Sequence, residues 1–140
     1  MEPDEALFID LVRTTDLLSR RLSQVLKTEG LSMTQYNVLR ILRGAREPVP
    51  SGEIGNHMIT RDPDITRLLD RLEKRGLIAR GREPRDRRMV LAWITPEGLE
   101  TLARLDEPVQ KAHREQLGHL GCERRKALAD LLENSRSHLG

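Results

Sequence analysis

Residues 51–94 constrain the fold most, because two short helical patterns are followed directly by two strand-like runs. Apolar residues recur at helical spacing over about 52–58 and again over 63–75. The segments LIAR at 77–80 and MVLAWI at 89–94 are apolar runs typical of strands. Two helices joined by a tight turn and followed by a hairpin form a winged helix-turn-helix. The predicted fold class is therefore mainly α (α+β), with a two-stranded wing.

Cap and breaker residues set the predicted helix ends. Ser51 is expected to cap the first short helix. Asp62 is expected to cap the second, with Pro63 at the first helical position, where its missing N–H costs nothing. Thr95 should cap a following helix that Pro108 kinks or interrupts. The segment GAREPVP at 44–50 is expected to be a loop.

A further helix is predicted over 33–43, within LSMTQYNVLRIL. Ser32 and Gln35 have the spacing of a capping box, in which each side chain satisfies the other residue's backbone N–H. Leu31 and Tyr36 flank this start at the positions of a hydrophobic staple.

Composition narrows the class of protein. The 140 residues are 37% hydrophobic and 33% charged, with Phe8, Tyr36 and Trp93 as the only aromatics. The core must therefore be aliphatic, which favours amphipathic helices. No apolar run approaches the roughly 20 residues of a membrane span, and the acidic N-terminus is unlike a secretory signal. A lone cysteine, Cys122, fits a reducing compartment, so we expect a cytoplasmic protein.

The sequence offers little for catalysis or metal binding. It holds no phosphate loop, nucleophile elbow or histidine–carboxylate constellation, so we expect no enzyme and no cofactor. No metal site is expected either: His119 and Cys122 are three residues apart, but a helix break is predicted at Gly121. Cys122 is more simply interpreted as a structural thiol than as an oxidant sensor.

Positive charge gathers in the region of the predicted winged fold. Residues 61–90 hold ten Lys or Arg and six Asp or Glu, whereas the rest of the chain holds fourteen basic and sixteen acidic residues. An ordinary solvated surface would also carry charges. Their coincidence with a helix-turn-helix pattern and with the arginine-rich hairpin tip REPRDR favours contact with DNA.

The stretch ITRLLDRLEKRGLIARGREPRDRRMVLAWITPEG resembles the signature of the MarR family of bacterial transcriptional regulators. That signature has a Thr-Arg-Leu recognition helix, Leu-Glu-x-x-Gly-Leu, an Arg-x-x-x-Asp-x-Arg wing and Leu-Thr-x-x-Gly. The last motif is Ile94-Thr95-Pro96-Glu97-Gly98 here. The resemblance runs over about 31–98 and implies a winged DNA-binding domain there. It also implies repression, the family's common mode, by occupation of the promoter.

The resemblance assigns roles to the wing and to the two preceding helices. It implies that Arg88 enters the minor groove and that Asp86 orients it by a hydrogen-bonded ion pair. Arg85 and Arg87 are expected to contact phosphates. The other expected DNA contacts are Arg61, Asp64, Thr66, Arg67, Arg71, Ser32 and Thr34.

Two acidic residues depart from the family pattern, because many relatives carry small hydroxyl residues there. Asp62 is explained as a cap. Asp64 could accept a hydrogen bond from a cytosine amino group or pair with Arg67 three residues on, and the pair is the preferred interpretation. The departure leaves the target DNA sequence open.

Helices are also predicted over 4–28 and about 122–138, the latter burying its leucines. Their apolar stripes have no evident partner inside one winged domain. The resemblance implies that segments 1–30 and 99–140 interleave in a two-fold dimer, which sets the recognition helices about 34 Å apart over a pseudo-palindrome. Alternatively, some of these residues close an intrachain core. The expected interface residues are Leu7, Phe8, Leu11, Leu128, Leu131, Leu132 and Leu139.

An effector is the remaining expected partner, besides double-stranded DNA and a second copy of the chain. The resemblance implies a small aromatic or anionic ligand between the dimer helices and the DNA-binding lobe. Arg13 and Tyr36 could line that pocket, although the staple position already explains Tyr36. Two alternatives stay open: a nonspecific, architectural DNA-binding protein and a winged-helix module that binds protein.

Overall fold

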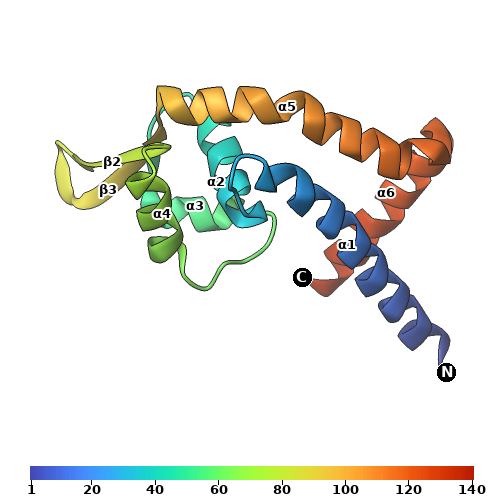
Figure 1. Ribbon diagram of the computed structural model, residues 1–140. Coiled ribbons are helices and arrows are strands. Elements are labelled where there is room, and N and C mark those ends of the chain that lie inside the picture. Colours follow the sequence, from blue (N-terminus) through green and yellow to red (C-terminus); the bar gives the residue numbers. More distant parts are fainter.

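The computed structural model describes residues 1–140, and its elements follow the predicted order with one short strand added. The elements are α1 (Pro3–Lys27), α2 (Met33–Gly44), β1 (Val49–Pro50), α3 (Ser51–His57), α4 (Ile65–Lys74), β2 (Ile78–Glu83), β3 (Asp86–Ile94), α5 (Pro96–Leu117), a 3-10 turn (Gly118–Leu120) and α6 (Gly121–Leu139). Figure 1 shows a lobe built from α2, α3, α4 and the hairpin, with α5 running across it and the N-terminal part of α1 projecting away. The fold is a winged helix-turn-helix flanked by long helices, as predicted.

The hydrophobic core lies inside this lobe. The C-terminal turn of α1 packs there against α2, α3, α4, the sheet and α5. Its largest fully buried side chains are aliphatic: Leu26, Leu39, Ile54, Leu69, Leu72, Ile78, Leu102 and Leu105. Burying each such side chain stabilises the fold by about 1.5–3 kcal/mol, so the scarcity of aromatics does not prevent a stable core.

The sheet is antiparallel with strand order β1-β3-β2. Strand β1 lies in the segment predicted as a loop and pairs Val49 with Ala92. Two residues that include a proline carry no periodicity, so this edge strand leaves no signal in the sequence. The hairpin strands are also longer than predicted, leaving only Pro84 and Arg85 in the turn, because main-chain pairing does not require apolar side chains.

The start of α4 differs from the prediction. The helix begins at Ile65, and its N-cap is Asp64, whose carboxylate accepts the backbone N–H of Arg67 at 3.0 Å. Asp62 instead accepts the N–H of Asp64 at 2.8 Å and shapes the turn that precedes the helix. Both aspartates have capping chemistry, so the residue type alone does not decide between them.

The cap predicted at Ser51 was wrong, and Pro108 does not interrupt α5. Ser51 lies inside the first turn of α3, and its hydroxyl makes no capping hydrogen bond. Helix α5 continues through Pro108. Leu105 and Val109 are buried on either side of the proline, and this packing offsets the hydrogen bond that proline removes.

The capping box at Ser32 and the cap at Thr95 are both confirmed. Next to that cap, Gly98 lies so close to the end of α4 that an added Cβ would collide with the carbonyl oxygen of Leu77. The family motif therefore ends in glycine because no side chain fits between α5 and the hairpin.

Helix α6 has no buried residue in the single chain, which contradicts the prediction that it buries its leucines. Leu128 is 41% exposed and Leu131 67% exposed, while Leu132 is half-buried. The N-terminal part of α1 is similarly open, with Phe8 66% exposed.

A membrane-spanning helix is absent, since no helix combines the necessary length with the necessary apolar composition.

Candidate nucleic-acid interface

Helix α4 has one face in the core and one in solvent. Leu68, Leu69 and Leu72 are buried. The opposite face presents Thr66, Arg67 and Arg71, which are exposed. The N-cap at Asp64 fixes the first turn of this helix. Since the packed face holds the helix from behind, the exposed side chains near its N-terminus can enter a groove without unfolding anything.

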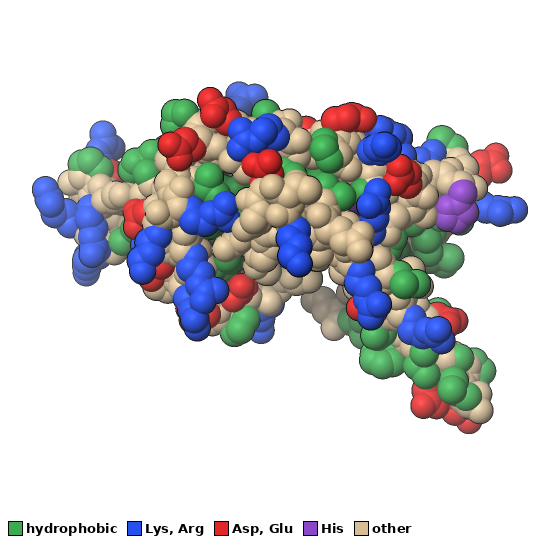
Figure 2. Space-filling model, in the orientation of Figure 1, with side chains coloured by type: hydrophobic (Ala, Val, Ile, Leu, Met, Phe, Trp, Pro, Cys, Tyr) green, Lys and Arg blue, Asp and Glu red, His purple; other side chains and the backbone are tan.

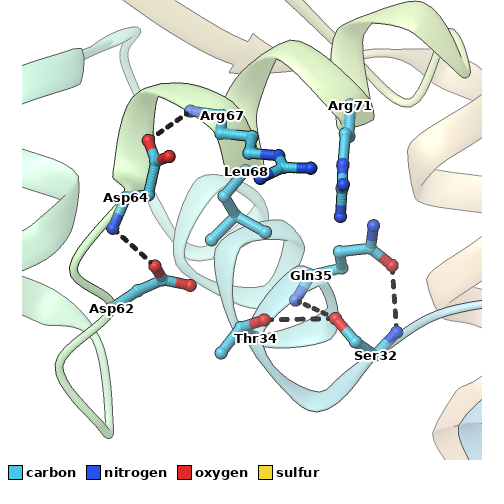
Figure 3. Close-up of a pocket in the computed structure, with 8 residues that line it drawn as sticks. All are labelled: Ser32, Thr34, Gln35, Asp62, Asp64, Arg67, Leu68 and Arg71. Carbon is cyan, nitrogen blue, oxygen red and sulfur yellow. Dashed lines mark hydrogen bonds between the residues drawn. The ribbon is translucent and has the colours of Figure 1, made fainter.

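The start of α4 faces the start of α2 across a hollow of about 270 Å³ (Figure 3). The hollow is lined by Ser32, Thr34, Gln35, Asp62, Asp64, Arg67, Leu68 and Arg71. Gln35 Oε1 accepts the Ser32 N–H at 2.9 Å, and the Ser32 hydroxyl accepts the Gln35 N–H at 3.1 Å. The hollow thus holds two guanidinium groups, from Arg67 and Arg71, and two carboxylates, from Asp62 and Asp64, beside the positive end of the α2 dipole.

Asp64 does not make the side-chain pair with Arg67 that was preferred. Its carboxylate is bound to the Arg67 backbone, and the Arg67 guanidinium extends away from it (Figure 3). The carboxylate is exposed despite its capping role. Arg61 lies in the exposed loop before α4, on the approach to the same hollow.

Three exposed arginines follow Pro84 at the wing tip: Arg85, Arg87 and Arg88. Asp86 Oδ1 accepts the backbone N–H of Arg88 at 3.1 Å and lies 3.5 Å from the Arg88 Nε. The Arg88 side chain is otherwise free, at 95% exposure. Arg82, which is also exposed, donates to the carbonyl of Arg87 at 3.0 Å and so braces the hairpin.

Arg80 joins the wing to α4, a link that the sequence did not reveal. Its guanidinium, on β2, pairs with Glu73 at 2.9 Å and with Asp70. The hydrogen bond to Glu73 is the largest cause that raises the pKa of Arg80 above its ordinary value. Asp70 of α4 is thus engaged at the base of the wing. The arginine that ends the apolar run LIAR was the only available signal for this contact.

Figure 2 shows Lys and Arg side chains gathered on the side of the molecule that carries the wing and α4. The three basic sets, at the α2–α4 hollow, on the outer face of α4 and at the wing tip, thus lie on connected elements. The charge imbalance in residues 61–90 becomes a basic surface because the buried leucines of α4 turn its charged residues outward.

A separate pocket of about 280 Å³ lies beneath α1 and α5. It is lined by Leu22, Met33, Thr34, Tyr36, Asn37, Arg40, Ile59, Thr60 and His113. The Tyr36 hydroxyl accepts a hydrogen bond from Arg40 at 3.1 Å, and the Arg40 guanidinium lies 5.7 Å from the centre of the tyrosine ring. Arg13 lies on the exposed part of α1 and is not among the lining residues.

The fold and this surface define a class: a winged helix-turn-helix protein of the DNA-binding type. The model of the MarR family matches residues 31–90. The HTH-type transcriptional regulator PecS of Dickeya dadantii is 30% identical over 131 residues, covering 92% of this chain and 79% of PecS. The chain belongs to the MarR family of transcriptional regulators.

Solved structures agree with this assignment. A MarR transcription factor from Planctomyces limnophilus is 39% identical, with a TM-score of 0.73 and coverage of 95% of this chain and 96% of the other. BpsR of Bordetella bronchiseptica, solved in work on regulation of its DNA binding by 6-hydroxynicotinic acid, shares the fold with a TM-score of 0.86. It is 22% identical, and the match covers 97% of this chain and 96% of BpsR.

Proposed function

We propose that this protein is a sequence-specific transcriptional repressor that binds a pseudo-palindromic operator as a homodimer. The observation that carries the proposal is the exposed, N-capped start of α4, which lies between the hollow at α2 and the arginine-tipped wing. A duplex that receives α4 in its major groove brings a phosphate backbone toward the hollow and a minor groove toward the wing.

The geometry supports different roles for the DNA-contacting residues: base reading, phosphate binding and insertion into the minor groove. Thr66, Arg67 and the exposed Asp64 carboxylate lie at the first turn of α4, where base edges are read. Phosphate contacts then come from the hollow and its approaches: Ser32, Thr34, Arg61 and Arg71. On the wing, Arg88 enters the minor groove, held by Asp86, and Arg85 and Arg87 bind phosphates.

Apolar surface on the flanking helices supports the homodimer. Exposed leucines and a phenylalanine line α1 and α6, and Figure 2 shows hydrophobic side chains along the projecting arm of α1. The residues proposed to bury against a second copy are Leu7, Phe8, Leu11, Leu128, Leu131, Leu132 and Leu139. Large apolar areas of this kind are rare on monomeric proteins. The proposed organisation is a DNA-binding domain at 31–98 between dimerisation segments at 1–30 and 99–140.

The pocket at Tyr36 supports regulation by a small aromatic or anionic effector. It offers an aromatic ring beside the Arg40 guanidinium and His113, between the flanking helices and the DNA-binding lobe. DNA binding by BpsR, which has the same fold, is regulated by 6-hydroxynicotinic acid, a molecule of this chemistry. An effector bound in this pocket would favour one arrangement of α2 and α4 relative to α1 and α5 over another, and so would change DNA binding.

The test is a selection of bound duplexes from random DNA in the presence of competitor, followed by measurement of affinity and mass. A specific repressor should hold its selected palindrome at least about 10³-fold more tightly than random DNA. The complex should contain two chains of 16.0 kDa each per operator. Equal affinity for selected and random DNA would instead favour an architectural role, and no DNA binding would favour a protein-binding module.

A further inference from the structure

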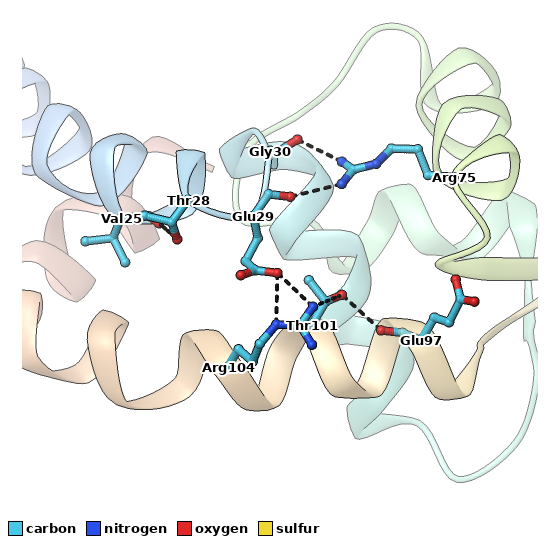
Figure 4. A network of polar contacts seen from close by, with 8 residues as sticks. All are labelled: Val25, Thr28, Glu29, Gly30, Arg75, Glu97, Thr101 and Arg104. Carbon is cyan, nitrogen blue, oxygen red and sulfur yellow. Dashed lines mark hydrogen bonds and ion pairs between the residues drawn. The ribbon is translucent and has the colours of Figure 1, made fainter.

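The side chain of Arg75 joins the end of the recognition helix to the end of α1 (Figure 4). Its Nη1 donates to the backbone carbonyl of Gly30 at 2.7 Å, and its Nη2 donates to that of Glu29 at 2.9 Å. Both carbonyls follow the last helical turn of α1, where such groups need partners from outside the helix. One planar guanidinium holds both, which the single nitrogen of a lysine would do less well.

The two helix ends that Arg75 joins are built in the same way. Glu29-Gly30-Leu31 and Arg75-Gly76-Leu77 each place a glycine in the left-handed region, at φ 67° and 76°. The N–H of each following leucine then donates back to a carbonyl five residues earlier, at 3.2 and 3.1 Å. Both ends are closed, hydrogen-bonded turns, so a contact between them couples two defined positions rather than two loose chains.

The connection continues from α1 to α5. The Glu29 carboxylate accepts hydrogen bonds from Arg104 of α5, at 3.1 Å from Nε and 2.8 Å from Nη2. Arg43 and Arg21 also reach α5, but from α2 and α1. Arg80 ties α4 only to the wing. Arg75 is therefore the polar side chain that links the recognition helix to the α1–α5 pair.

We propose that Arg75 is a positioning residue for operator recognition, and that it sets the half-site spacing the dimer accepts. This inference rests on the proposed function, because α1 must belong to the dimer. In a two-fold dimer any rotation of α4 relative to α1 occurs in both copies, so it changes the distance between the recognition helices. Arg75 lies at the C-terminal end of α4, away from the turn that meets the bases, and so governs spacing rather than base choice.

The test uses the full-length protein and duplexes in which the two selected half-sites are moved apart or together by one and two base pairs. The parent should bind one spacing at least about tenfold more tightly than the others. A wrong spacing costs the dimer at least one well-placed contact, and such a loss typically lowers affinity by about that factor. Arg75→Ala should reduce that preference to about threefold or less. Its affinity for a single half-site should stay near that of the parent. Arg75→Lys, which keeps one donor nitrogen in place of two, should show a preference between those of the parent and of Arg75→Ala.

Arg21→Ala is the matched control. It removes an exposed arginine that pairs with Glu115 of α5 at 2.9 Å and does not touch α4, so the parent's spacing preference should persist. A folded Arg75→Ala with the parent's preference would overturn the inference, as would an equal loss in Arg21→Ala. Should Arg75→Ala not fold by circular dichroism, a parent-like profile in Arg75→Lys overturns it. A parent that shows no preferred spacing would contradict the proposed function itself.

Discussion

Asp86 holds Arg88 in two ways, since one carboxylate oxygen accepts the Arg88 backbone N–H at 3.1 Å and lies 3.5 Å from its Nε. The carboxylate is about half exposed, so the ion pair itself contributes little to folding stability. Its effect is on geometry: it limits the directions that an almost fully exposed guanidinium samples before DNA arrives. Ordering a side chain before binding reduces the entropy that binding must offset.

Asp86→Ala separates orientation from charge. The substitution makes the protein more positive, so simple electrostatics predicts tighter binding. If Asp86 orients Arg88, operator affinity should instead fall by about three- to tenfold, since an immobilised side chain costs about 0.5–1.5 kcal/mol. Affinity would be measured at two salt concentrations. Glu83→Ala adds the same charge across the same turn without touching Arg88 and should not weaken binding. An Asp86→Ala protein that binds as tightly as the parent at both salts removes Asp86 from the mechanism.

Substitution of Arg88 and substitution of Arg87 should lower DNA affinity in different ways, depending on the base composition of the operator flanks. A guanidinium in the minor groove is attracted most where that groove is narrow, at A·T-rich steps. Arg88→Ala should therefore flatten the preference for A·T over G·C flanks. Arg87→Ala should weaken binding to both flanks alike and reduce the salt slope by about one unit. The measurement is affinity for operators that differ only in their flanks, and an equal response of the two variants would refute the separate roles.

Arg67 and Arg71 offer the same contrast on α4. Both are exposed and line the hollow, but Arg67 is in the first turn and Arg71 is one turn further along. Arg67→Ala should cost about 1–3 kcal/mol on the operator and clearly less on random DNA. Arg71→Ala should weaken binding to both by similar factors. If Arg67→Ala lowers affinity for both DNAs equally, Arg67 contacts phosphates instead.

Local signals were sufficient to predict most of the elements. The capping box at Ser32 and the amphipathic leucines of α4 each act within a few residues, so the sequence displays them directly. The contact between Asp86 and Arg88 was expected from the resemblance to the MarR family wing, and the structure places the two side chains 3.5 Å apart.

Contacts between segments that are distant in the chain could not be predicted from the sequence. Strand β1 exists only because β3 pairs with it, and α5 continues through Pro108 only because residues on both sides of the proline are buried. Arg75 and Arg80 look like ordinary surface charges in the sequence. Their roles depend on partners that the fold brings close: the carbonyls that follow α1 for Arg75, and Asp70 and Glu73 of α4 for Arg80.

The cap at Asp64 can be separated from any role of its charge. Asp64→Ala should destabilise the protein by about 1 kcal/mol, because the Arg67 N–H loses its acceptor. Asp64→Ser keeps a capping oxygen and removes the charge, so it should retain most of the stability. Thermal or denaturant unfolding measures both variants. If Asp64→Ser keeps stability but changes the selected operator, the carboxylate reads a base; an unchanged operator confines it to capping.

Glu29 gives the molecule a predictable response to acid. The hydrogen bond from Arg104 is the largest cause that lowers the pKa of Glu29 below its ordinary value of 4.5. A carboxyl group with a lowered pKa in the folded state stabilises the fold above its unfolded pKa, and that contribution is lost as the pH falls through the folded pKa. Glu29→Gln should therefore have a lower Tm than the parent at pH 7.

The gap between parent and Glu29→Gln should begin to close near pH 4.5 and should disappear at lower pH, where the parent's Glu29 is itself protonated. Glu107→Gln is the matched control, since it breaks an exposed ion pair with Arg114 inside α5 alone. Exposed pairs of that kind contribute at most about 1 kcal/mol, so this variant should stay close to the parent. A gap for Glu29→Gln that stays constant from pH 7 to pH 3 would show that the carboxylate charge is not what holds α1 to α5.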